Sequence, residues 1–487
     1  MQTVKKVALW ALGILVVLAL AVWLLTRPAT GKLSEAELTG PHPTLAKADA
    51  ETFPTIYVTD PIGWTAGQAP TPAAGLAVNR FAEGLAHPRS VYVLTNGDVL
   101  VAETNSQPRP NRTITQKATN YVMDKVGAGG PSPDRIELLR DRDGDGKAEQ
   151  KFVFRSGLKS PFGMALREGP DGTELLIANT DAVLSFPFKV GDTALTGAPT
   201  KLMDLPGNGN HWARNLLLSP DGAKLYITVG SSSNIAEGGI DKEEGRAAIQ
   251  EYDFAKKSHR IFAAGLRNPN GMDWNPSTGE LWTVVNERDQ LGPDLVPDYL
   301  TDVPFGSHYG WPWIYWKDNL DMRVDEPAPE YTLNYIRKPE YALGSHTAPL
   351  GLVFARGGNL MGPSFANGAF IARHGSWNRK PLAGYDVIFV PFNANGKALP
   401  GQPLKVLSGF LSGDKQAHGR PTWLAWAKDG ALLVSDDTGG VIWRVVAPGA
   451  KPAAAIAPVK STSVGNRVEL PDSLRGTITQ PNEVFKN

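Results

Sequence analysis

The sequence predicts an all-β fold, a six-bladed β-propeller, on three observations about its 487 residues. A segment that begins with Gly, runs as an apolar alternation, turns at a Gly-containing pair and becomes apolar again recurs six times. Gly and Pro are abundant, at 51 and 39 residues, and helical periodicity is scarce, as expected for short strands joined by many turns. Hairpins repeated radially build a propeller, so six copies predict six blades.

The six copies share an opening Gly and usually reach a Pro before the first apolar run. They are Gly84–Pro88, Gly157–Pro161, Gly209–His211, Gly265–Pro269, Gly344–Pro349 and Gly419–Pro421. Their turns are predicted at Asn96-Gly97, Asp171-Gly172, Asp221-Gly222, Thr278-Gly279, Gly357-Gly358 and Asp429-Gly430. The repeat length of about sixty residues exceeds that of compact blades, so long insertions are expected in the loops.

The two ends of the chain predict a membrane segment and a tail. Lys5 and Lys6 precede an apolar run that is long enough to cross a bilayer as one helix. The expected organisation is a cytoplasmic stub (1–6), a transmembrane anchor or signal segment (7–26), a stalk and capping segment (27–75), the propeller (76–447) and a Pro/Ala-rich tail (448–487). The apolar run continues past a possible cleavage site at Ala19-Leu20-Ala21, which favours an anchor over a cleaved signal peptide. Either way the body is expected in the bacterial periplasm, on the outer side of the inner membrane if the anchor is kept.

The composition and the absent motifs argue against several classes of partner and cofactor. The 49 basic and 49 acidic residues cancel and no polybasic run occurs, which argues against nucleic acid as a partner. Without cysteine there is no disulfide, thiol nucleophile or Cys-ligated metal. No Gly-x-Ser-x-Gly elbow, phosphate-cradling Gly loop or Gly-x-Gly-x-x-Gly helix start is present, so nicotinamide, flavin and nucleotide chemistry lack support.

One column of the repeat predicts the site. Residues just before the innermost strand of each blade converge on one mouth of the channel. This column holds Ala86, Lys159, His211, Arg267, His346 and Arg420. The ends of the following strands add Glu103, Asn179, Ser231, Glu287-Arg288-Asp289, His374 and Asp436-Asp437. A cationic floor with acidic and amide neighbours predicts a site for a small polyanionic ligand and a metal ion, although any one of these residues alone could be a turn residue facing water.

His211 is the predicted general base, because an imidazole at the channel mouth can take a proton near neutral pH. The alternative is a histidine that is hydrogen-bonded inside the ring for packing alone. His346 and His374 occupy comparable positions. In the insert from Asp289 to Trp313, Tyr309 and Trp311 stand among Gly and Pro residues. They are expected either to form a wall for a ring-shaped ligand or to pack on a blade.

A second metal site is predicted at a hairpin tip. Asp141, Asp143, Asp145 and Glu149 occupy positions one, three, five and nine of a calcium loop. Position twelve, where a bidentate Glu belongs, is Phe152. The flanking segments look like strands, so the loop is either a structural calcium site or a plain Asp/Gly turn.

Several motifs carry a family resemblance. They are Gly265-Leu-Arg-Asn-Pro-Asn-Gly271, Val285-Asn-Glu-Arg-Asp289, Tyr309-Gly-Trp-Pro312, His374-Gly-Ser-Trp-Asn-Arg379 and Gly419-Arg-Pro421. With them the chain resembles, over residues 76–447, the glucose/sorbosone dehydrogenase family of soluble quinoprotein sugar dehydrogenases, and the sorbosone dehydrogenase branch most. The resemblance implies pyrroloquinoline quinone and calcium at the channel mouth of a six-bladed propeller, with a histidine that removes the substrate's hydroxyl proton.

The resemblance also implies roles for individual residues. His211 falls on the family's base and Arg420 on an arginine that contacts the cofactor. Backbone carbonyls near Glu287, Arg288 and Asp289 fall where calcium is held. The other expected cofactor contacts are Lys159, Asn234, Arg267, His346, His374, Tyr309 and Trp311. Two positions depart from the pattern: Ser231-Ser-Ser-Asn234 replaces an Arg-Asn pair of the glucose-oxidising members, and Arg373-His374-Gly375 stands where the family has a lysine.

These features predict a membrane-anchored periplasmic oxidoreductase for a sugar or related aldehyde, with an electron acceptor that the sequence does not identify. Two alternatives remain open. One is a calcium-dependent, lactonase-like propeller hydrolase in which His211 activates water. The other is a non-catalytic propeller that binds a ligand at the cell surface.

Overall fold

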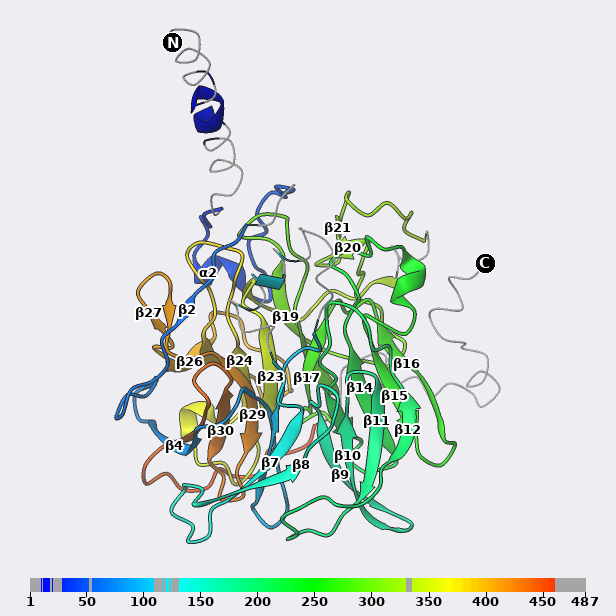
Figure 1. Cartoon of the computed structure of the whole chain (residues 1–487), viewed down its shortest axis with the longest axis vertical. Coiled ribbons are helices and arrows are strands. Elements are labelled where there is room, and N and C mark those ends of the chain that lie inside the picture. Colours follow the sequence, from blue (N-terminus) through cyan, green and yellow to red (C-terminus); the bar gives the residue numbers. More distant parts are fainter. Residues whose placement is uncertain are drawn as a thin grey trace, which may run out of the picture.

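The computed structural model describes residues 29–51, 55–108, 131–329 and 335–459, with isolated positions in 10–20 and 117–124. Antiparallel strands dominate (Figure 1). The helical elements whose bounds are described are short: α2 (Glu35–Leu38), η1 (Ile240–Glu243) and η2 (Pro363–Phe365). The expected all-β fold is therefore confirmed.

Six antiparallel sheets of four or five strands contain most of the strands in the described part of the chain. The first three contain β5 (Pro88–Val93), β6 (Val99–Glu103), β7 (Arg135–Arg140) and β8 (Gln150–Arg155); β9 (Met164–Gly169), β10 (Gly172–Ala178), β11 (Ala182–Pro187) and β12 (Thr200–Asp204); and β13 (Leu216–Leu218), β14 (Lys224–Val229), β15 (Ala248–Asp253) and β16 (Ser258–Ala264). The fourth contains β17 (Pro269–Trp274), β18 (Leu281–Val285), β19 (Pro297–Asp302), β22 (Tyr341–Ser345) and β1 (Thr39–Gly40).

The last two sheets recruit strands from the N-terminal part of the chain. They contain β23 (Pro349–Phe354), β24 (Gly368–Arg373), β25 (Asp386–Pro391), β26 (Leu404–Ser408) and β3 (Thr71–Pro72); and β29 (Pro421–Trp426), β30 (Leu432–Asp436), β31 (Val441–Val446) and β4 (Ala77–Glu83). Two small sheets lie outside these six: β2 (Asp60–Pro61) with β28 (Gln416–Ala417) and β27 (Leu411–Ser412), and β20 (Ile314–Tyr315) with β21 (Asn319–Leu320).

The repeated sequence segment corresponds to the first hairpin of each sheet. All six predicted turns lie between the first and second strands or at the start of the second, and the second residue of each pair is a glycine with positive φ, for example 101° at Gly97 and 91° at Gly430. In four sheets the Pro of the repeat is the first residue of the first strand, where its missing N–H removes no interior ladder bond.

The first strands of the six sheets contact one another in a ring. β17 lies beside β13 and β23, β29 lies beside β23 and β5, and β13 lies beside β9. The N–H of Leu166 on β9 donates to the Tyr92 hydroxyl on β5 at 3.0 Å, which joins the remaining pair. At Gly271 on β17 a Cβ would lie 2.6 Å from the Leu350 carbonyl oxygen, so this close approach requires glycine. The arrangement is propeller-like.

The ring closes with strands from distant parts of the chain. β4 pairs antiparallel with β31, with Glu83 opposite Val441 and Ala77 opposite Val446.

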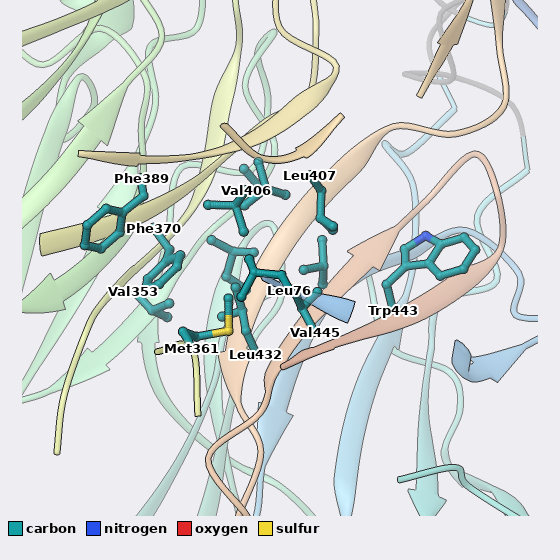
Figure 2. Close-up of a cluster of buried hydrophobic side chains, with 14 of the residues drawn as sticks. Leu76, Val353, Met361, Phe370, Phe389, Val406, Leu407, Leu432, Trp443 and Val445 are labelled. Carbon is teal, nitrogen blue, oxygen red and sulfur yellow. The ribbon is translucent and has the colours of Figure 1, made fainter. Parts of the chain in front are cut away.

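The hydrophobic core fills the spaces between neighbouring sheets. In Figure 2, Phe370 and Phe389 lie on one side of such a layer and Trp443 on the other, and Phe370 and Trp443 are fully buried. Side chains of this size contribute several kcal/mol each, so these layers hold the sheets together (about 3–5 kcal/mol for Phe or Trp truncation).

The N-terminal segment from residue 29 runs along the loops of the fourth and fifth sheets. Gly31 N donates to the Lys380 carbonyl at 2.7 Å, and Tyr57 N donates to the Trp377 carbonyl at 2.7 Å. No helix of the described residues is long and apolar enough to cross a membrane. Most of the predicted anchor, residues 7–26, lies outside the described residues, as do residues 460–487 of the predicted tail.

Candidate functional site

A cavity of about 440 Å³ lies where the loops before the first strands meet the loops after the second strands. Five of the six sheets contribute to its lining, and the second sheet (β9–β12) contributes none of the residues that line it. The charged and imidazole side chains on its wall are Arg89, His211, Glu237, Arg267, Glu287, Asp289, Asp298, His346, His374 and Arg420. The predicted convergence of the repeat column is thus observed for His211, Arg267, His346 and Arg420.

His211 is held in one tautomer. Its Nδ1 lies 2.8 Å from the Ser231 carbonyl oxygen and 3.0 Å from the Ser231 hydroxyl. That hydroxyl already donates to the Ser233 carbonyl at 2.7 Å, so Nδ1 must carry the hydrogen that both Ser231 oxygens accept. Burial, together with the nearby Arg267 and Arg214, lowers the pKa of His211 to about 3. The imidazole is therefore neutral and Nε2 keeps its lone pair, but a pKa this low makes it a weaker base than the near-neutral imidazole expected from the sequence.

Arg267 is buried and its guanidinium is fully engaged. It donates to the Glu287 carbonyl at 2.7 Å and to the Asn234 side-chain oxygen at 2.9 Å. A third bond, of 3.0 Å, reaches the Asp289 carboxylate. Burial raises the pKa of Asp289, but Arg267 and His346 outweigh it and hold that pKa at about 2. Arg267 and Asp289 therefore form a fixed ion pair in the cavity wall.

His346 belongs to the same cluster. Its Nε2 lies 3.1 Å from the Gly292 carbonyl oxygen, and its Nδ1 lies 3.4 Å from an Asp289 carboxylate oxygen. Burial lowers the pKa of His346, but its contact with Asp289 outweighs burial and raises it overall. The Asn378 side-chain nitrogen also lies 3.2 Å from Nδ1, so protein groups contact both ring nitrogens and His346 has no nitrogen left for a substrate proton.

His374 contacts a buried carboxylate. Its Nε2 lies 2.9 Å from Asp437 Oδ2, which also accepts a 2.5 Å bond from Arg89. Burial, with Arg420 nearby, lowers the pKa of His374 to about 3. Burial raises the pKa of Asp437, but His374, His87 and Arg89 outweigh it and keep the carboxylate ionised. The neutral imidazole therefore donates its Nε2–H to Asp437.

Arg420 supports the loop that carries His374. Its Nε donates to the His374 carbonyl at 3.1 Å and its Nη2 to the Gly375 carbonyl at 3.0 Å. The guanidinium carbon lies 5.3 Å from the centre of the Tyr385 ring. Arg420 thus adds a positive charge to the wall and fixes the backbone at the same time.

Two polar atoms in the wall lack a hydrogen-bond partner within the described part of the chain, Arg89 Nε and Asn378 Oδ1. Arg89 is 8% exposed and Asn378 is 5% exposed, so water compensates neither fully. A buried donor or acceptor without a partner costs about 1–3 kcal/mol. A ligand with an acceptor beside Arg89 and a donor beside Asn378 would satisfy both atoms.

Asp298 closes the floor on the β19 side. It accepts from Glu287 N at 2.8 Å and from Ala348 N at 2.9 Å. Burial raises the pKa of Asp298 to about 6, in spite of these bonds. Its oxygens connect the loop after β18 to the loop before β23, so it shapes the cavity.

Three of the expected cofactor contacts, Lys159, Tyr309 and Trp311, do not line this cavity. Lys159 has an exposed ammonium group, 2.6 Å from Asp181, and does not line the cavity, because the second sheet stands back from it. Tyr309 is buried and donates its hydroxyl to the Asp302 carbonyl. Trp311 donates to the Asn234 carbonyl at 2.9 Å and lines a separate cavity of about 270 Å³. The aromatic residues of this insert are therefore packed against the protein, as in the second interpretation of the loop.

Arg288 is fully buried and turns away from the cavity. It bonds the Glu287 carboxylate at 2.9 Å and the Ile314 carbonyl at 2.9 Å, which ties the insert to the fourth sheet. The Glu287 carbonyl, one of the predicted calcium ligands, accepts the Arg267 hydrogen bond described above. A calcium ion there would share this oxygen with a guanidinium group.

The predicted calcium loop is the tip of the β7–β8 hairpin, as expected. One oxygen of each of Asp141, Asp143, Asp145 and Glu149 lies within 4.8 Å of all the others. The backbone already uses these carboxylates, since Gly144 N and Gly146 N donate to Asp141 at 2.7 and 2.9 Å. Calcium binding at this tip stays a prediction.

Sequence reasoning missed several lining residues. Arg89 lies one residue after the Pro of the first copy, whereas the column was aligned on Ala86. Its signal was an arginine inside an otherwise apolar strand. Asn378 was part of a quoted motif without a role. Asn210, Asn268, Asn286 and Gln290 add further carboxamides to the wall, and only the folded ring brings them together.

Comparison with known proteins gives a family match. A model described as TrAA12-like matches residues 138–299 and 327–447, more than half of the chain. Among curated relatives, an uncharacterised protein of Borreliella burgdorferi is 33% identical over 245 residues, which is 50% of this chain and 62% of the relative. A pyrroloquinoline quinone-dependent pyranose dehydrogenase of Coprinopsis cinerea is 26% identical over 77% of this chain and 54% of its own length. The chain thus spans less than two thirds of the length of these relatives.

Solved structures show the same fold. A Trichoderma reesei member of Carbohydrate-Active Enzymes family AA12 has a TM-score of 0.63 at 20% identity and covers 77% of this chain and 97% of its own. The holo quinone domain of the Coprinopsis cinerea pyranose dehydrogenase has a TM-score of 0.60 at 22% identity, over 80% of this chain and 100% of its own. These likenesses confirm the propeller-like fold.

Proposed function

The chain belongs to the TrAA12-like family, and on that basis we propose that it is a quinone-dependent oxidoreductase for a sugar or a related aldehyde or alcohol. The observation that carries the proposal is the geometry of His211, whose Nδ1 contacts both Ser231 oxygens in a cavity that three arginines also line. The six sheets of the described residues support our assignment of six blades.

The cavity residues fit pyrroloquinoline quinone as the cofactor. It carries three carboxylates, and Arg89, Arg267 and Arg420 supply positive charge from three different sheets. The buried Arg89 Nε lacks a protein acceptor, which a ligand carboxylate or carbonyl would provide. When bound, the quinone supplies a two-electron acceptor beside the substrate.

The chain's own residues do the proton chemistry and the positioning. His211 Nε2 takes the proton of the substrate hydroxyl, and the resulting charge on Nδ1–H is shared with the two Ser231 oxygens. The fixed Arg267–Asp289 pair and Arg420 hold the cofactor side of the cavity. Carboxamides such as Asn210 and Gln290 offer donors and acceptors for sugar hydroxyls.

Calcium is the less supported half of the proposed cofactor set. The Glu287 carbonyl already accepts from Arg267, so an ion there would need the guanidinium to shift. The Asp289 carboxylate, whose pKa is held at about 2, offers an ionised oxygen nearby. Titration of the quinone-loaded protein with calcium measures whether quinone affinity depends on the ion.

The test is to load the purified protein with pyrroloquinoline quinone and calcium and to follow the reduction of an artificial dye acceptor with aldoses and sorbosone. We expect dye reduction with at least one sugar and a raised melting temperature on quinone binding. For a His211→Ala variant in the same assay, the matched control is His259→Ala, which changes an exposed histidine. No turnover together with no thermal shift would refute the proposal.

We also propose that the body lies in the periplasm, attached to the inner membrane by residues 7–26. The support is the apolar run after Lys5 and Lys6 in the sequence. Membrane fractionation and N-terminal sequencing of the mature protein test this. If all of the protein is found in the soluble periplasmic fraction and its N-terminal residue lies beyond residue 21, the result would favour a cleaved signal peptide.

A further inference from the structure

His374 and Asp437 form a hydrogen-bonded pair that the proposed role of His211 does not use. His374 follows β24 and Asp437 follows β30, so neighbouring sheets supply the two groups. Both are buried, at 7% and 3% exposed, and they are 2.9 Å apart from nitrogen to oxygen.

The partners of this pair fix the histidine tautomer. Asp437 is ionised and can only accept, so His374 Nε2 carries the hydrogen. Arg89 is 3.5 Å from the same nitrogen but 2.5 Å from the carboxylate, so its bond goes to Asp437. His374 Nδ1 then keeps a lone pair, and the described residues show no hydrogen bond to it. Thr438 holds the other Asp437 oxygen at 3.0 Å.

The other charged groups near the imidazole are accounted for. Arg420 holds the His374 carbonyl, and His87 Nε2 lies 3.8 Å from Asp437. Arg89 also reaches across the cavity, with its guanidinium carbon 5.6 Å from the Trp212 ring centre, next to His211. Its Nε is the donor without a partner described above. The Arg89 guanidinium thus lies between His374, whose Nε2 is 3.5 Å from its Nη1, and the Trp212 ring.

The proton balance of the proposed reaction leaves two protons to be removed when the cofactor is reoxidised. Oxidation of a hydroxyl to a carbonyl breaks one C–H and one O–H bond. The C–H hydrogen leaves with two electrons to the acceptor, and the O–H proton leaves to His211. The reduced acceptor would need one further proton, which His211 can return. Passing its two electrons on would release two protons, so His211 can take one and a second base beside the cofactor can take the other.

We propose that His374 and Asp437 are a second proton-transfer pair in this cavity: His374 Nδ1 exchanges a proton with the bound quinone, and Asp437 positions the ring and stabilises the imidazolium. This inference rests on the proposed function. His346 is not suited to this role because protein groups contact both of its nitrogens, Gly292 at Nε2 and Asn378 with Asp289 at Nδ1. In Asp298 the two carboxylate oxygens accept from backbone N–H groups.

The first test needs neither cofactor nor turnover. Long-range proton–nitrogen NMR of histidine-labelled full-length protein reports which imidazole nitrogen carries hydrogen, and His374→Gln assigns the signal. We expect neutral His374 with hydrogen on Nε2 at pH 7. In Asp437→Asn the side-chain amide can donate, so the hydrogen should move to Nδ1. An Nδ1–H tautomer in the unsubstituted protein would overturn the inference.

The second test separates the two half-reactions by stopped flow. In Asp437→Asn and His374→Gln, quinone reduction by sugar should stay within about threefold, and dye reoxidation should slow at least about tenfold. His211→Ala should show the opposite split. Asp98→Asn is the matched control, because it weakens a buried Asp–Arg pair outside the cavity, and both steps should stay unchanged.

The outcomes separate this inference from the proposed function. Equal slowing of both half-reactions in Asp437→Asn, or no slowing of reoxidation in His374→Gln, would overturn the proton-transfer pair while the enzyme remains a quinone oxidoreductase. A folded, unsubstituted protein that neither binds nor reduces the quinone would overturn both.

Discussion

The cavity and the Asp141–Glu149 loop both gather charged side chains, but they reach their partners in different ways. In the loop, each carboxylate accepts from a backbone N–H at most seven positions away. In the cavity, Arg89 and Asp437 are 348 positions apart, and His374 and Asp437 are 63 apart. The loop is therefore built by local chain geometry, whereas the cavity exists only when the ring of sheets is complete.

Solvent exposure also differs between the Asp141–Glu149 loop and the cavity. The loop carboxylates lie largely in solvent and are screened by it, so they are expected to contribute little to stability. The cavity groups are buried, and their pKa values move to about 3 for His211 and His374. Substitutions in the cavity should consequently have large effects, and matched substitutions in the loop should have small ones.

The largest expected effect is on catalysis. His211→Ala removes the proposed base, and kcat for sugar oxidation should fall by about 10²- to 10⁴-fold. Quinone affinity, measured by fluorescence titration, should change by less than about threefold, since the imidazole accepts a proton and adds no charge. Activity within tenfold of the unsubstituted protein would remove His211 from the mechanism.

The second effect is on stability. Arg267→Met removes the guanidinium partner of the partly exposed Asp289 carboxylate, which should cost about 1.5–3 kcal/mol of unfolding free energy. Arg142→Met in the exposed loop should cost less than about 0.5 kcal/mol. Urea unfolding of both variants measures the difference, and equal costs would contradict the comparison.

The third effect is a loss of stability in acid. His211 and His374 have folded-state pKa values of about 3, below the unfolded value of 6.5, so their contribution is complete above pH 6.5 and is lost as the pH falls toward 3. The loss is about 1.4 kcal/mol per pH unit for each group. Asp298, with its pKa raised to about 6, opposes this trend below pH 6.

A comparison of variants isolates the contribution of His374 to this loss of stability in acid. The fall in unfolding free energy from pH 7 to pH 5 should be smaller in His374→Gln than in the unsubstituted protein, by about 2 kcal/mol. The control is His259→Gln on the surface, which should not alter the fall. Parallel curves for all three proteins would mean that His374 is not buried in the neutral form.

The smallest effect concerns calcium at the loop. Ten millimolar calcium should stabilise the protein by about 1 kcal/mol, given millimolar affinity for a loop without a ligand at position twelve. Asp143→Ala should abolish this shift without changing the calcium dependence of quinone binding. Absence of any shift in the unsubstituted protein would identify the hairpin tip as a plain turn.

The same contrast explains what the sequence could predict. The hairpins, their glycine turns and the convergence of His211, Arg267, His346 and Arg420 follow from the repeat, because each copy specifies its own sheet. Lys159 fails to reach the cavity because a repeat assigns equal positions, whereas the second sheet stands back from it. Arg89 was missed because its importance comes from Asp437, which no local pattern connects to it.

The pairing of β4 with β31 sets the order of maturation. Residues 77–83 are synthesised long before their partners at 441–446, since Glu83 and Val441 are 358 positions apart. Until that final strand docks, the walls that carry Arg89 and Asp437 cannot face each other, and a nascent chain has no pocket to fill. Loading of a small molecule into this cavity therefore has to follow the docking of β31.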